Sequence, residues 1–150
     1  MNSSPESRLR TRDEAMLRPA RSRAREIARQ AYVYGIWLLF ASIIFQFFLA
    51  GLGVLDNPVF FSWHATLGVV VGLLPLVLVA VGAFGQVPRG TLWLTAAVFA
   101  LVVLQSVLID VYRYAMGSVR AIAALHLVNA LLIFWVCLKL LERAARLSTR

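Results

Sequence analysis

Four long uncharged stretches dominate the pattern of this chain. Apolar residues prevail in each, and no Asp, Glu, Lys or Arg occurs in residues 30–55, 57–88, 90–109 or 121–138. A helix needs about 20 apolar residues to cross a bilayer core, and every stretch is long enough, the last narrowly. Lipid-facing strands would alternate in polarity, which these stretches do not. The pattern predicts membrane-spanning helices at about residues 31–54, 59–83, 90–111 and 119–140.

Turn signals separate the predicted helices. They are Asn57-Pro58, residues 85–88 and residues 116–118. Such short connections make consecutive helices antiparallel neighbours. We therefore expect an all-α fold, an integral membrane four-helix up-down bundle. In it the second and fourth helices lie diagonally across the core and run in the same direction.

The charges outside these stretches predict the topology. Of 15 Lys and Arg residues, all but Arg113 and Arg120 precede the first span, follow the second or lie in the tail. The positive-inside rule then puts both termini in the cytoplasm. With 61% hydrophobic residues, the chain has little room for a soluble domain. Residues 1–30 would form a basic leader, partly disordered or amphipathic, and residues 142–150 a basic tail. We expect no nucleic-acid partner, because no recognition motif accompanies the arginines.

The two histidines, His64 and His126, lie in the second and fourth predicted spans. With Asn57 and Ser118 as N-caps, each histidine is about 10 to 12 Å from the outer helix end. The diagonal of such a bundle measures about 11 to 14 Å. Two imidazoles that share one iron need Cα atoms about 12 to 13 Å apart. The spacing predicts that both histidines are metal ligands of one haem b.

Few other polar residues occur inside the spans, and we expect three of them at about the membrane depth of the histidines. Gln46, Gln105 and Asn129 fall in the outer half of the membrane, where a polar group needs a partner. We predict that they surround the cofactor or hold its ligands. Gly68 follows His64 by one turn and would let a flat ring approach, although helix packing uses glycine in the same way.

Arg113 and Arg120 are the basic residues of the outer face, and they flank the loop before the fourth span. They are candidates to neutralise haem propionates. Cations at helix ends also reach lipid headgroups without any ligand, so both interpretations of these arginines stay open.

Two short segments carry a family resemblance. Trp63–Gly68 reads WHATLG and Ala124–Ala130 reads ALHLVNA, and both resemble the haem-ligand segments in one four-helix half of the haem A synthase fold. Gln105 is similar to the glutamine of that family's third helix. The resemblance covers about residues 31–141 and implies haem ligation by His64 and His126. Single units of this kind also resemble a bacterial family of uncharacterised membrane proteins, which implies a multi-pass protein of the cytoplasmic membrane.

The chain departs from that family in the residues that matter for haem synthesis. Haem A synthases carry an acid three positions before the first ligand histidine, where this chain has Phe61. The external cysteine pair and the second half of the tandem are also missing. Two strong axial ligands leave iron no open position for a substrate. We therefore expect electron transfer or haem carriage, with membrane lipid and a quinone or another redox protein as partners.

A second interpretation needs no cofactor. The chain would be an accessory subunit in a larger membrane complex, with its histidines hydrogen-bonded to Gln46, Gln105 or Asn129. Transport of protons or divalent metal is disfavoured, because no carboxylate lies at mid-membrane. The sequence also lacks the residue groupings of a soluble-type enzyme.

Overall fold

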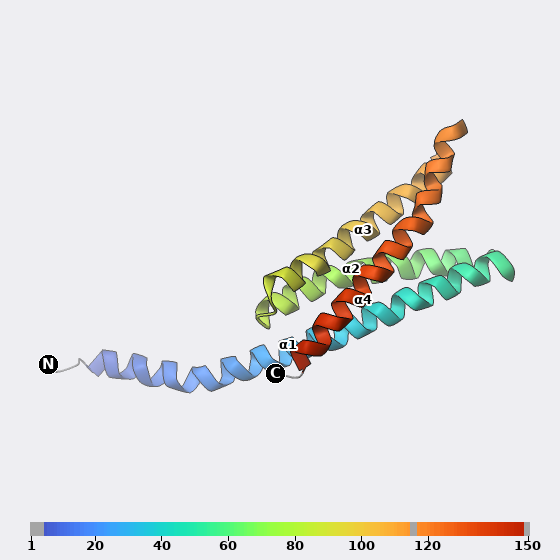
Figure 1. Ribbon diagram of the computed structural model, residues 1–150. Coiled ribbons are helices and arrows are strands. Elements are labelled where there is room, and N and C mark those ends of the chain that lie inside the picture. The colour runs from blue at the N-terminus through green and yellow to red at the C-terminus, as the bar shows by residue number, and fades with distance from the viewer. Residues whose placement is uncertain (1–4, 115–116, 149–150) are drawn as a thin grey trace.

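The chain folds into long helices (Figure 1). The computed structural model describes the backbone of residues 5–114 and 117–148, and the side chains of residues 22–111, 113–114 and 121–148. Its elements are α1 (Pro5–Leu55), α2 (Phe60–Phe84), α3 (Arg89–Tyr114), the 3₁₀ helix η1 (Gly117–Ala124) and α4 (Leu125–Ser148). No strand occurs in these ranges, as predicted for an all-α chain.

Each long helix contains a segment that could cross a membrane. These segments, Ser22–Leu55, Phe60–Phe84, Arg89–Val111 and Ala121–Ser148, are long and apolar enough to span a bilayer. Their outward faces carry large apolar side chains such as Phe48, Trp63 and Leu127, which are more than half exposed. A lipid environment removes the cost of this exposure, since acyl chains are as apolar as the side chains. The structure thus confirms an all-helical chain with four helices suited to a membrane.

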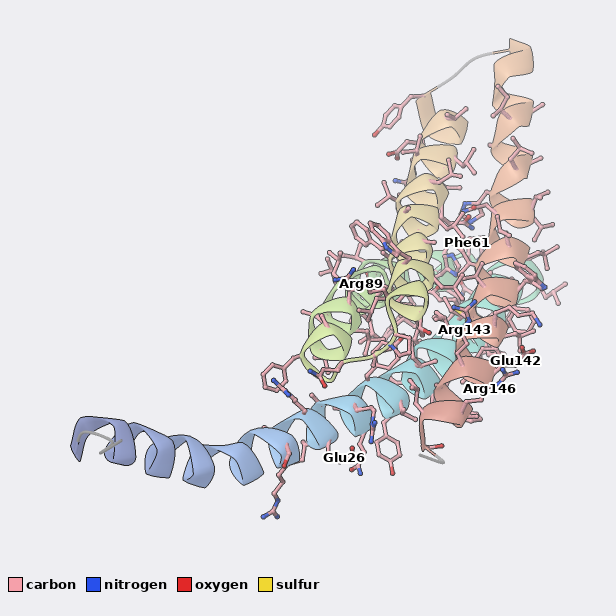
Figure 2. All side chains as sticks on the ribbon, turned by 60° about the vertical axis from the view of Figure 1, so that its left-hand side comes forward. Glu26, Phe61, Arg89, Glu142, Arg143 and Arg146 are labelled. Atoms are coloured by element: carbon pink, nitrogen blue, oxygen red, sulfur yellow. The ribbon has the colours of Figure 1, made fainter. Side chains whose placement is uncertain are left out.

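The helices form a ring of neighbours. α1 packs against α2 and α4, and α3 packs against the same two helices. Among the described residues the backbones of α2 and α4 do not approach each other, so these two helices are diagonal, as predicted. In both views the α1–α2 pair diverges from the α3–α4 pair toward the loops that end α1 and α3 (Figures 1 and 2).

The most deeply buried apolar side chains come from three of the helices. Tyr32 and Leu39 of α1, Val98 of α3 and Leu140 of α4 are fully buried in one core cluster. The Thr95 hydroxyl donates to the carbonyl of Thr91 at 3.0 Å. Its single proton is used in that bond, so the Tyr32 hydroxyl, 2.7 Å away, must donate to Thr95 Oγ1. The sequence analysis missed this polar pair, which is satisfied within the chain.

The start of the last helix differs from the prediction. We expected Ser118 to cap it, but Ser118 lies inside η1, and α4 begins only at Leu125. Gly117, Ser118 and the β-branched Val119 are weak helix formers, and this explains the delayed start. His126 is therefore the second residue of α4 and not two turns into it.

The other predicted cap, Asn57, does cap a turn. Its Oδ1 accepts a hydrogen bond from the Val59 amide at 2.9 Å, and its carbonyl accepts one from Phe60 at 3.1 Å. α2 follows directly from Phe60. α1 begins at Pro5, so residues 5–30 of the predicted leader form one helix with the first span.

Candidate functional site

His64 is oriented by the neighbouring helix. It lies in the second turn of α2, and its Nδ1 is 3.0 Å from the main-chain carbonyl oxygen of Gln46 in α1. A carbonyl oxygen can only accept a hydrogen bond, so Nδ1 carries the proton. Nε2 then keeps its lone pair. The α1–α2 contact thus selects one tautomer and one ring orientation.

His126 has the same arrangement in the other helix pair. Its Nδ1 is 3.1 Å from the main-chain carbonyl oxygen of Gln105 in α3. In return, Gln105 Nε2 donates to the carbonyl of His126 at 2.9 Å. The same reasoning puts the proton on Nδ1 and the lone pair on Nε2. Both imidazoles are half-buried, and no described residue hydrogen bonds to Nε2 of either ring.

This geometry is typical of metal-binding histidines. Such residues usually donate their second ring N–H to a carbonyl or carboxylate, which fixes the tautomer and increases ligand basicity. His64 and His126 lie on the two diagonal helices, α2 and α4. The described residues contain no group of three or more His, Cys, Asp or Glu side chains that could hold a bare metal ion. Two imidazoles match a metal whose other ligands come from a macrocycle.

Gln105 and Asn129 form a bonded pair beside His126. Asn129 Nδ2 donates to Gln105 Oε1 at 2.6 Å and to the Leu101 carbonyl at 2.8 Å. Both ends of the Gln105 amide are therefore used, one by Asn129 and one by the His126 carbonyl. Asn129 is 6% exposed, and its Oδ1 has no partner among the described residues. The structure thus brings together His126, Gln105 and Asn129, three of the residues predicted for the site.

Gln46 is held differently, although it is also a glutamine next to a histidine. Its side chain is 9% exposed, yet neither Nε2 nor Oε1 has a hydrogen-bond partner among the described residues. A Cβ added to Gly68 would lie 3.4 Å from Gln46 Nε2, so the amide packs against the glycine. His64 therefore contacts the main chain of Gln46, and Gly68 contacts the side chain of Gln46.

Arg113, one of the two predicted arginines, does not contact the histidines or the polar residues beside them. Arg113 is exposed and forms a 3.7 Å ion pair with Asp110, one turn back on α3. The side chain of Arg120 lies outside the described residues. Phe61, at the position of the synthase acid, packs on α1, where a Cβ on Gly53 would come within 2.9 Å of its ring. An apolar contact thus occupies that position.

Comparison with known proteins gives one family. Residues 46–112 match the model of a family of unknown function, DUF6220. The match covers the end of α1, all of α2 and most of α3, and it includes Gln46, His64, Gly68 and Gln105 but not His126. No curated protein and no solved structure matches the chain. The resemblance to haem A synthase stays a prediction that rests on short motifs.

The sequence analysis missed the groups that orient the histidines. Gln46, Gln105 and Asn129 were the predicted partners, and the structure uses the main-chain carbonyls of Gln46 and Gln105. Every residue has a carbonyl, so no residue type marks this role. The signal in the sequence was a glutamine predicted at about the same membrane depth as each histidine.

Proposed function

We propose that this protein binds one haem b between α2 and α4, with His64 and His126 as axial ligands, and acts in electron transfer or haem carriage. One observation carries the proposal. Each imidazole donates its Nδ1–H to a main-chain carbonyl of the adjacent helix, and this leaves each Nε2 as a lone-pair donor. A structural histidine needs one such bond, but the same tautomer on both diagonal helices fits a shared metal better.

The surroundings of the two rings support the fit. α2 and α4 are diagonal, with no contact between their described backbones, and the helix pairs diverge toward the loops after α1 and α3 (Figure 1). Asn129 Oδ1 is a buried polar atom without a partner among the described residues, and it lies beside Gln105, whose carbonyl orients His126. A bound bis-histidine haem would supply one-electron redox chemistry and leave no open position for a substrate.

The proposal includes a topology. We infer an up-down bundle in the cytoplasmic membrane with both termini in the cytoplasm. Arg89, Arg143 and Arg146 lie on the side of the bundle where α3 begins and α4 ends (Figure 2). Arg143 Nη1 also donates to the Gly90 carbonyl at 2.9 Å, which links these two ends. Basic residues at this end support a cytoplasmic location by the positive-inside rule.

Absorption spectra of the purified protein test the haem assignment. We expect a reduced low-spin haem band after haem is supplied, and loss of that band in His64→Ala and in His126→Ala. Thr95→Val serves as the control, because it changes a buried polar residue away from the histidines. A colourless wild type, or His→Ala spectra equal to wild type, would overturn the assignment.

The second candidate is an accessory subunit without a cofactor. It is favoured by the fact that each ring already has a hydrogen-bond partner in the chain. Purification from its native membrane would then yield a colourless protein with one stoichiometric partner. Haem absorption in the isolated chain would show that the protein is not a subunit without a cofactor.

A further inference from the structure

The Gln46 amide is the polar group that the haem proposal leaves unexplained. It is nine-tenths buried, and neither Nε2 nor Oε1 has a partner among the described residues. Leaving a buried donor and acceptor unpaired costs free energy that a simple apolar residue would avoid. Gln105, in the equivalent place beside His126, uses both ends of its amide. Gln46 thus offers an NH2 group as donor and a carbonyl oxygen as acceptor to a ligand.

The surroundings of Gln46 restrict the chemistry of that ligand. No charged residue occurs in residues 30–55 or 57–88, so neither α1 nor α2 supplies a counter-ion at this level. Charged groups inside a membrane need such a partner. The ligand must therefore be neutral, and it must be soluble in the bilayer to reach a site within the membrane-spanning segment Ser22–Leu55.

The shape of the site favours a flat ring. Gly68 lies against the amide and has no side chain to occupy the space beside it. Phe45, Phe47 and Phe48, next to Gln46 in the chain, are exposed and do not face the amide, because adjacent helix positions point in different directions. The space beside the amide is therefore bounded by the backbone of Gly68, and a flat ring fits there better than a bulky group.

We infer that Gln46 is the hydrogen-bonding residue of a binding site for a lipophilic quinone and its quinol, placed between α1 and α2 beside His64. A quinone carbonyl accepts from Nε2–H, and a quinol hydroxyl donates to Oε1. One unpaired amide therefore suits both redox forms. The inference rests on the proposed function for its physiological meaning, since it places the redox partner near an axial ligand. Binding itself does not require haem.

Amide NMR and calorimetry of the haem-free full chain in lipid nanodiscs test the site, with decylubiquinone as the probe. The Gln46 side-chain resonance, identified by its absence in Gln46→Leu, should shift saturably with decylubiquinone. Decanol and decylbenzene, which lack the quinone ring or its oxygens, should not shift it. A wild type whose Gln46 resonance does not move, or moves equally with decanol, would overturn the quinone assignment.

Affinity gives the second measurement. Gln46→Leu should weaken decylubiquinone binding about tenfold, the value of a buried hydrogen bond. Gln30→Leu is the matched control on the same helix, because Gln30 is exposed and bonds to Glu26. It should leave the affinity unchanged, and thermal unfolding should show that both variants fold. Equal affinity of Gln46→Leu and wild type would contradict the inference.

The haem proposal and the quinone site can be refuted independently of each other. Gln46→Leu keeps the main-chain carbonyl that orients His64, so it should still take up haem. Quinone binding without any haem uptake would refute the proposed function and leave this site standing. Haem uptake with no quinone binding in any variant would refute the quinone site alone.

Discussion

Replacing Gln105 should destabilise the fold, whereas replacing Gln46 should not. Gln105→Leu removes two bonds, one to the His126 carbonyl at 2.9 Å and one from Asn129 at 2.6 Å. Side-chain hydrogen bonds inside membrane proteins are worth about 0.6 kcal/mol on average and at most about 1.7 kcal/mol. The loss should therefore be about 1 to 3 kcal/mol. Gln46→Leu removes no side-chain bond formed by the described residues and should be neutral or stabilising.

Reversible unfolding in mixed micelles, followed by circular dichroism, measures both changes. Gln46→Leu is the matched control for Gln105→Leu, because the residue type and the substitution are the same and the main-chain carbonyl of each glutamine is bonded to a histidine. Haem and quinone must be absent, since a ligand that binds the folded state stabilises it. Equal losses for the two variants, or a larger loss for Gln46→Leu, would refute the assignment of one glutamine as bonded and the other as unpaired.

Substitutions of Thr95, Gly82 and Arg113, two of them with a control variant, probe other parts of the bundle by the same unfolding assay. Thr95→Val should cost about 1 to 3 kcal/mol, because it leaves the buried Tyr32 hydroxyl unpaired, and Thr95→Ser should recover most of the loss. Gly82→Ala should lower stability by about 1 to 3 kcal/mol, since its Cβ would lie 2.7 Å from the Tyr32 ring, whereas Gly51→Ala meets nothing within 4 Å and should not. Arg113→Ala should change stability by less than about 1 kcal/mol, because its ion pair is exposed. A large effect of Arg113→Ala, or none of Gly82→Ala, would contradict the described packing.

The fold was predictable because a membrane demands a simple sequence pattern. In lipid every backbone polar group must be satisfied within the protein, which leaves helices or closed barrels. The charge-free stretches lack the alternating polarity of barrel strands, so they were predicted as helices, and the structure has helices there. Short turns such as Asn57-Pro58 then made α1 and α2 neighbours, and the diagonal relation of α2 and α4 followed. The start of α4 was not predictable in the same way. Residues 117–124 form a 3₁₀ helix, and local preferences there are weak on both sides of the boundary.

The candidate site was predictable in its membership but not in its bonding. Gln46 and Gln105 are the same residue type and were both predicted in the outer half of the membrane, so nothing in the sequence separates them. They differ because Asn129 lies opposite Gln105, whereas Gly68 lies opposite Gln46. That difference depends on how each helix is rotated about its axis, which hydrophobic periodicity determines only loosely when apolar residues surround the whole helix.

A pyridine haemochrome assay on the full chain, expressed with haem supplied and purified in lipid nanodiscs, measures whether His64 and His126 hold a haem. We expect one haem b per chain in the wild type and none above background in the His64→Ala/His126→Ala double variant. A wild-type haem content equal to that of the double variant would contradict this expectation.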